Sequence, residues 1–169
     1  MQTRFLAAAA AFVLSCQLAL AGSLVKVELS PIEHLEATLV VVGKDGTQTA
    51  YTPAELEAFP TYSLTTTTPW REETAKFEGV LLTDILASSG LDKIDTVTVM
   101  AENDYKTVFE RELWENVDFL VATRVNGAAI SRRARGPFLF VIDMDTLTHS
   151  EIADESSLVW MASRIEPGV

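Results

Sequence analysis

The alternation of apolar and polar positions predicts strands along much of the chain. "DTVTVMA" (95–101) and "LVWMASRIE" (158–166) carry an apolar residue at every second position, as a strand with one buried face does. "KTVFE" (106–110) has the pattern of a return partner for the first of these. "TYSLTTTT" (61–68) is rich in β-branched residues and ends at Pro69. These segments predict a protein dominated by strands.

Two further patterns predict hairpins. "ATLVVVG" and "KDGTQTAY" together cover 37–51, and Lys44, Asp45 and Gly46 supply the turn between them. "DFLVATRV" (118–125) runs into Asn126-Gly127, a strong signal for a tight hairpin turn. "FLFVID" (138–143) is a continuous apolar run, which is typical of a strand buried on both faces.

Short helices are expected between these strands. "TPAELEAFP" (52–60) offers Thr52 as N-cap, Pro53 at the first helical position and Glu55 in the first turn. "VLLTDILASSG" (80–90) places Leu81, Leu82, Ile85 and Leu86 on one helical face, and "RELWEN" (111–116) is a third short helix. Irregular short helices among many strands indicate an α+β fold with mixed β-sheets, not a doubly wound parallel sheet.

Residues 1–21 have the pattern of an export signal. Arg4 precedes the apolar stretch "FLAAAAAFVLS", and Ala19 and Ala21 are the small residues of a cleavage site. We therefore expect residues 1–21 to be removed as a signal peptide and 22–169 to form one domain. The expected location is the periplasm.

The chain is strongly acidic, with 13 Lys and Arg against 24 Asp and Glu and a formal charge of −11. This balance disfavours nucleic acid and direct membrane association, because both need a basic surface. The single cysteine, Cys16, lies in the expected signal peptide. After cleavage no thiolate would remain to act as a nucleophile or a metal ligand.

Conventional hydrolytic and metal chemistry find little support. Ser150, His149 and Asp145 are the types needed for a triad, but no nucleophile-elbow motif accompanies them. "DMDTLTHSEIADE" (143–155) offers oxygen ligands, yet Leu147 stands where a calcium loop needs a ligand. We read this segment as a solvated acidic loop, and we expect no catalytic and no metal-binding residues.

The three tryptophans have different surroundings. Trp114 lies beside Leu113 in an expected helix, and core packing is its default role. Trp160 lies in an expected apolar strand, where packing or a ligand contact are both open. Trp70 follows "TTTTP" at a strand end among polar residues, so it either lines a pocket or contacts a partner.

Two polar segments have a structural and a functional interpretation. "AENDYK" (101–106) is either a plain turn or an amide and a carboxylate presented at the mouth of a sheet. "SRRARGP" (131–137) is either a solvated basic turn or the wall of an anion-binding site. Arg132 is expected to point to solvent.

Five segments in this order resemble the molybdopterin-binding domain of the sulfite oxidase superfamily, in particular its small stand-alone periplasmic members. They are "TTTTPW", "FEGVLLTDIL", "AENDY", "VATRVNGAAISRRARGP" and "VWMASRIE". The resemblance spans about residues 36–167. It implies the sulfite oxidase-like molybdopterin-binding fold, with a pterin-binding cleft framed by these segments.

The resemblance has one departure. Enzymes of the family bind molybdenum through the cofactor's enedithiolate and a protein cysteine, and this chain reads "TTTTPWREETAKFEG" where that cysteine belongs. A threonine hydroxyl does not replace a soft thiolate. Cysteine-less members are similar to periplasmic pterin-binding proteins that regulate a membrane-bound partner, typically a cyclic-di-GMP enzyme.

We therefore expect a non-catalytic sensor that binds a free or reduced pterin without molybdenum. Its expected partner is the periplasmic segment of an inner-membrane signalling protein, either a cyclic-di-GMP enzyme or a sensor kinase. The alternative is a molybdopterin-dependent oxidoreductase of the sulfite oxidase type. A pterin needs a flat stacking partner, an acceptor for its amino edge and donors for its carbonyl edge. The expected ligand-binding residues are Thr67, Thr68, Trp70, Asn103, Asp104, Tyr105, Arg124, Arg133, Arg135 and Trp160.

Overall fold

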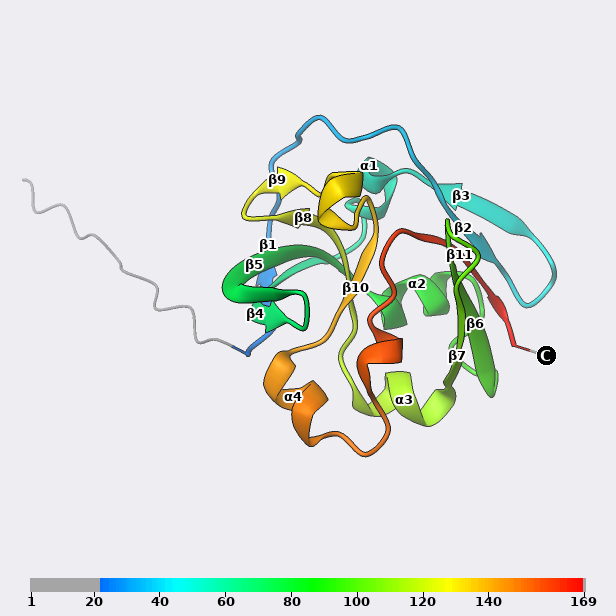
Figure 1. Cartoon of the computed structure of the whole chain (residues 1–169). Coiled ribbons are helices and arrows are strands. Elements are labelled where there is room, and N and C mark those ends of the chain that lie inside the picture. Colours follow the sequence, from blue (N-terminus) through cyan, green and yellow to red (C-terminus); the bar gives the residue numbers. More distant parts are fainter. Residues whose placement is uncertain (1–21, 169) are drawn as a thin grey trace, which may run out of the picture.

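A computed structural model describes residues 22–168 (Figure 1). The expected signal peptide, 1–21, lies outside the described residues, as does Val169. No helix between residues 22 and 168 is long and apolar enough to cross a membrane.

Two β-sheets form the body of the protein and lie on opposite sides of it in Figure 1. The first sheet has the order β1 (Val25–Val27), β4 (Thr61–Thr68), β5 (Arg71–Leu81), β8 (Leu120–Val125) and β10 (Leu139–Val141), and β9 (Ala128–Ala129) pairs with β8. The second has the order β3 (Gln48–Tyr51), β2 (Leu39–Val42), β11 (Ala162–Pro167), β6 (Thr96–Ala101) and β7 (Lys106–Glu110). In the described part of the chain, β2 and β11 alone pair in parallel, and the other ladders are antiparallel.

The space between the sheets holds the main hydrophobic core. Buried side chains from both sheets belong to it, among them Val80, Val99, Phe140 and Ile165. A second, smaller apolar cluster, which includes Leu64, Phe77, Leu120 and Leu139, lies on the first sheet. Because successive residues of a strand point to opposite faces, β8 and β10 supply side chains to both clusters, and β10 is buried throughout, as predicted.

Between residues 22 and 168, four short helices connect the strands: α1 (Pro53–Leu56), α2 (Leu82–Ser88), α3 (Arg111–Asn116) and α4 (Met144–His149). The same range contains two 3₁₀ turns, η1 (Arg132–Ala134) and η2 (Glu155–Ser157). Thr52 is the N-cap of α1, as the sequence predicts, and together with Glu55 it forms a reciprocal capping box. Leu82, Ile85 and Leu86 of α2 are buried in the main core.

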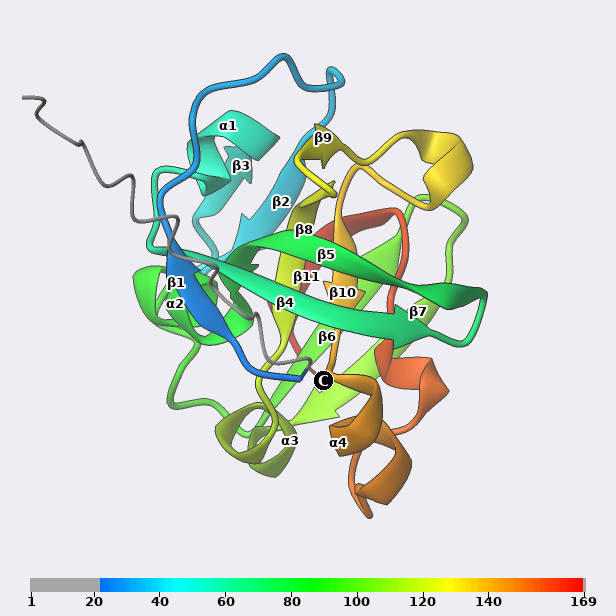
Figure 2. The same cartoon turned by 90° about the vertical axis from the view of Figure 1, so that its left-hand side faces the viewer.

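The sequence-based interpretation is wrong at three places. Residues 71–81, which we had not assigned to a strand, form β5, the longest strand of the described chain, and Figure 2 shows the β4–β5 hairpin crossing the face of the molecule. The segment read as an acidic loop contains α4, capped by the Asp143 side chain. The last strand begins at Ala162 and not near Leu158, because Met161 has a positive φ of 55° that interrupts it.

Candidate functional site

A cavity of about 350 Å³ lies over the second apolar cluster of the first sheet. Its apolar floor includes Phe77 of β5 and Leu139 of β10. We call it the arginine cavity, because three of its nine lining residues are arginines: Trp70, Arg71, Phe77, Val125, Ile130, Arg133, Ala134, Arg135 and Leu139. The β4–β5 hairpin and the segment containing η1 therefore meet at one site.

The basic segment is held in a defined shape. The Ser131 hydroxyl caps η1 by accepting a hydrogen bond from the Ala134 amide at 3.2 Å. Arg135 follows in the left-handed region with φ 72°. A Cβ on Gly136 would lie 2.1 Å from the Ile130 carbonyl oxygen, so only glycine allows the backbone to approach this closely. The turn thus aims Arg133 and Arg135 at the cavity.

Arg135 stacks on two tryptophans. Its guanidinium carbon lies 4.7 Å from the centre of the Trp70 ring and 4.7 Å from the centre of the Trp160 ring. Both distances are within the range of cation–π attraction. Because the N–H groups of a guanidinium lie in its own plane, stacking leaves them available to an acceptor at its edge.

The arginines divide into two groups. Four of the seven arginines between residues 22 and 168 form ion pairs with acidic side chains: Arg111 with Asp95, Arg124 with Glu57, Arg132 with Glu102, and Arg164 with Glu166. Within the same described range, Arg71, Arg133 and Arg135 have no such pair, and all three line the arginine cavity. In a chain with a large excess of acids, this grouping concentrates uncompensated positive charge at one place.

The β4–β5 hairpin adds two buried polar atoms without a hydrogen-bond partner. They are Oγ1 of Thr68 and Nε of Arg71, and these two residues are paired positions of the hairpin. Thr67 is half-buried in the same strand. A buried donor without a partner is costly, and a ligand oxygen would relieve that cost. The sequence analysis missed Arg71, although its place directly after Trp70 at a strand end was the available signal.

The tip between β6 and β7 lies outside the lining of the cavity but touches the basic segment. Met161 joins the two, because its carbonyl accepts a hydrogen bond from the Glu102 amide and its amide donates to the Arg135 carbonyl, both at 2.9 Å. Asn103, Asp104 and Tyr105 are exposed, and Asp104 is a turn residue with φ 64°. Their role in ligand binding stays a prediction.

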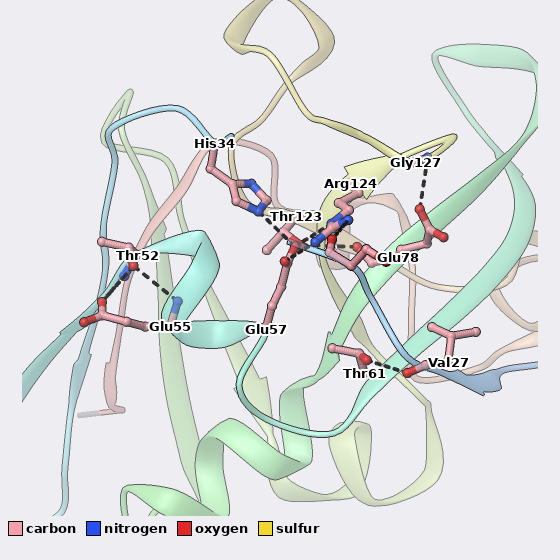
Figure 3. A network of polar contacts seen from close by, with 11 residues as sticks. Val27, His34, Thr52, Glu55, Glu57, Thr61, Glu78, Thr123, Arg124 and Gly127 are labelled. Atoms are coloured by element: carbon pink, nitrogen blue, oxygen red, sulfur yellow. Dashed lines mark hydrogen bonds and ion pairs between the residues drawn. The ribbon is translucent and has the colours of Figure 1, made fainter. Parts of the chain in front are cut away.

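Arg124 lies in a different environment from the other expected site residues (Figure 3). Its Nε donates to Glu57 at 2.8 Å, a second guanidinium nitrogen also contacts this carboxylate, and a third donates to the Ser30 carbonyl at 2.9 Å. Thr123 donates to Glu57 at 2.6 Å and His34 Nε2 lies 3.2 Å from it. The network ties β8 to α1 and to the segment before β2, and Arg124 is not among the residues that line the arginine cavity.

The network perturbs the ionisation of Glu57. Burial raises the pKa of its carboxyl, but hydrogen bonds from Arg124 and Thr123 and the neighbouring His34 outweigh this and hold that pKa below its ordinary value of 4.5. The hydrogen bond to Glu57 raises the pKa of Arg124. The pair is therefore charged at neutral pH.

The candidates for a hydrolytic triad lie at the exposed end of α4 and not in a pocket. His149 Nδ1 is 3.5 Å from Asp145 Oδ1, and the Ser150 hydroxyl accepts hydrogen bonds from the Ile152 and Ala153 amides. Within residues 22–168 there is no group of three or more His, Cys, Asp or Glu side chains that could hold a metal ion. Trp114 is buried in the main core, as the sequence predicts.

The comparison with known proteins shows the fold. No family model matches the chain, and no curated protein matches it. Its structure is similar to the crystal structure of the sulfane dehydrogenase SoxCD from Paracoccus pantotrophus, with a TM-score of 0.61 at 16% sequence identity. The match covers 92% of this chain and 49% of that one, so this chain spans about half the length of its structural neighbour.

The fold is sulfite oxidase-like. This confirms the expected α+β class, with two sheets and a few short helices. At 16% identity the likeness shows the fold alone, and the sulfane dehydrogenase activity belongs to the neighbour. The arginine cavity has donors that fit an anionic pterin, whereas its lining contains no thiol or carboxylate to ligate a metal.

Proposed function

We propose that this protein binds a pterin in the arginine cavity without catalysing a reaction on it. The observation that carries the proposal is that Arg71, Arg133 and Arg135, which form no ion pair within the described residues, line one cavity. A pterin offers carbonyl and ring-nitrogen acceptors to such donors, and a phosphate on its side chain would bind them more strongly. The apolar floor, with Phe77 and Leu139, suits a flat ring.

The cavity explains how an acidic protein can take up an anionic ligand. Its overall negative charge opposes anions at most of the surface, whereas a cavity lined by three arginines and by no carboxylate attracts them. Stacking on Trp70 and Trp160 holds the Arg135 guanidinium in place before the ligand arrives. Donors that are already oriented cost less conformational entropy on binding.

The amino edge of a pterin needs an acceptor, and the lining of the cavity offers no carboxylate. In our proposal the tip between β6 and β7 supplies it, through Asp104 with Asn103 and Tyr105 beside it. The contact of Met161 with both segments places this tip next to Arg135. Asp104→Asn keeps the turn conformation, since Asn also tolerates a positive φ, and tests the carboxylate alone.

The proposed setting is the periplasm, where the protein would regulate a membrane-bound cyclic-di-GMP enzyme or sensor kinase. The support is the export-signal pattern of residues 1–21 and the resemblance to periplasmic pterin-binding regulators. In this role the ligated and empty forms would differ in how they contact the partner's periplasmic segment. Localisation by cell fractionation tests the first part directly.

The alternative function is a molybdopterin-dependent oxidoreductase, which the fold likeness to a sulfane dehydrogenase favours. Against it stands the sequence, whose one cysteine is Cys16 in the expected signal peptide. If a molybdopterin were bound, Arg71, Arg133 and Arg135 would hold its phosphate, and the cofactor would supply the redox chemistry. Nothing in the lining would add a protein thiolate to the metal.

The experiment that tests the proposal combines extraction with titration. Protein purified from the periplasm should release a fluorescent pterin on denaturation, and emptied protein should quench added oxidised or reduced pterin in a saturable way. Metal analysis of the same preparation should give negligible molybdenum. Stoichiometric molybdenum with oxo-transfer turnover would establish the oxidoreductase instead.

A further inference from the structure

The strand β7 is one edge of the second sheet and pairs only with β6. The Ala101 amide donates to the Tyr105 carbonyl, and antiparallel ladders alternate between pairs that exchange hydrogen bonds and pairs that do not. This alternation turns the N–H and C=O groups of Lys106, Val108 and Glu110 away from β6. An edge with such free groups is a template for another strand.

A groove of about 230 Å³ runs between β7 and the segment that leads into η2. We call it the β7 groove, and it is lined by Thr107, Val108, Glu110, Glu112, Leu113, Ile152, Asp154, Ser156 and Ser157. The Val108 side chain is 54% exposed and the Ile152 side chain 41%. Tyr105, also 41% exposed, lies beside the groove and hydrogen-bonds the Ser156 carbonyl. Three of the five exposed large apolar residues within 22–168 thus gather here.

The charge around the groove is negative. Glu110, Glu112 and Asp154 line it, and Glu151 and Glu155 are exposed on the adjoining segment. These acids favour an occupant with Lys or Arg side chains. A second copy of this acidic chain would bring its own acidic groove to the interface, which opposes self-pairing.

We infer that the β7 groove is a docking surface for an extended, basic segment of another protein, which adds to the second sheet beside β7. Backbone hydrogen bonds to Lys106, Val108 and Glu110 would hold the segment, and alternate apolar side chains would pack between Val108 and Ile152. Lys or Arg side chains of the segment would meet Glu110 and Glu112. The existence of a partner rests on the proposed function, and the inference adds which surface of this protein the partner contacts. The groove and the arginine cavity share no lining residue.

A peptide of alternating lysine and valine serves as the probe, and the same peptide with an N-methyl group on every backbone amide is its control. The two peptides carry equal charge, but the second cannot form a strand ladder. Binding is measured by calorimetry at low and high salt and by the NMR shifts of the Lys106, Val108 and Glu110 amides. We expect saturable binding of the first peptide, at least about tenfold weaker binding of the second, and a loss of affinity with added salt.

Val108→Pro is the decisive variant. The N–H of Val108 points away from β6, so proline at this position removes a free donor and breaks no hydrogen bond of the β6–β7 ladder. An edge strand tolerates such a proline. Ala50→Pro is the matched control, because Ala50 is an exposed residue of β3, the strand at the opposite edge of the same sheet. The Gly43 amide donates to the Thr47 carbonyl, and by the same alternation the N–H of Ala50 points away from β2. We expect Val108→Pro to weaken the peptide at least about tenfold and Ala50→Pro to leave its affinity unchanged. Glu112→Gln should weaken it at low salt only.

Several outcomes would overturn the inference. Equal binding of the N-methylated peptide, or no effect of Val108→Pro, would reduce the interaction to charge attraction. A dimer in sedimentation that Val108→Pro abolishes would make a second copy the occupant, with Lys106 opposite Glu110 of the other chain. Pterin titration of the wild type and of Val108→Pro keeps the two proposals apart. A wild type that does not bind pterin would contradict the proposed function, whereas a wild type that does not bind the peptide would contradict the docking surface at the β7 groove.

Discussion

The guanidinium of Arg135 lies over the ring of Trp70, 4.7 Å from its centre, and at the same distance from the ring of Trp160. The face of Trp70 that meets Arg135 is therefore already covered. A pterin can instead meet the N–H edge of Arg135. The two tryptophans thus contribute to a ligand site chiefly by orienting an arginine.

Trp70→Ala and Trp160→Ala should each weaken pterin binding by about 0.5–2 kcal/mol, on the scale of the cation–π contact with Arg135 that each removes. Each removes one of the two rings that hold Arg135 in place. Trp114→Ala is the control, because this ring lies in the main core and should lower thermal stability with little effect on affinity per folded molecule. If Trp70→Ala lowers stability alone, its ring is a packing residue.

Glu57→Ala should lower the free energy of unfolding by about 3–5 kcal/mol, because it leaves the buried Arg124 without its partner. Urea unfolding measures this loss. The double variant Glu57→Leu with Arg124→Met should recover much of it, since an apolar pair replaces the ion pair. Affinity for pterin per folded molecule should stay unchanged in both. A folded Arg124 variant that no longer binds pterin would return Arg124 to the ligand site.

The Glu57 carboxyl also gives the stability a pH dependence. Its pKa in the folded protein lies below the ordinary value of 4.5, so the stabilisation is fully present above pH 4.5 and is lost as the pH falls through the folded value. The melting temperature of the wild type should therefore approach that of Glu57→Gln as the pH is lowered from 7 to 3. A constant gap between the two over this range would contradict the assignment.

Gly136→Ala should lower both thermal stability and pterin affinity. A Cβ at this position would lie 2.1 Å from the Ile130 carbonyl oxygen, so the basic turn has to move. Gly43→Ala is a milder control in the other sheet, where the nearest atoms would be 3.1 Å away. Circular dichroism and the pterin titration report the two effects. Unchanged affinity in a folded Gly136→Ala protein would mean that the turn does not position the ligand donors.

The sequence predicted most elements whose signals are local. The turn at Lys44–Gly46, the N-cap Thr52 of α1, and the Asn126-Gly127 hairpin all depend on residues close in the chain, and the structure has them. Five of the residues 71–76 in β5 have polar side chains and only Ala75 is apolar and buried, so their pattern had no alternation to recognise. Strand β5 exists because β4 and β8 pair with it on both sides.

The site shows the same division. Trp70, Arg133 and Arg135 were predicted from composition and position, and the structure brings them to one cavity. That Arg135 stacks on Trp160, or that Arg124 pairs with Glu57, depends on residues 25 or more positions apart. The sequence shows seven arginines beyond residue 21; only the three-dimensional arrangement separates the four that are paired with acids from the three that are not.

This division of the arginines is tested most directly by one titration. A phosphorylated pterin and its phosphate-free parent are each titrated by fluorescence quenching. The proteins compared are the wild type, Arg133→Ala, Arg135→Ala and Arg132→Ala. Arg132 is the matched control, because it belongs to the same turn but pairs with Glu102. Loss of a charge-assisted hydrogen bond should weaken the phosphorylated pterin about ten- to a hundredfold in Arg133→Ala and Arg135→Ala, and the parent less. Arg132→Ala should bind as the wild type does; equal losses in all three variants, or no binding of either pterin by the wild type, would contradict the proposed ligand site.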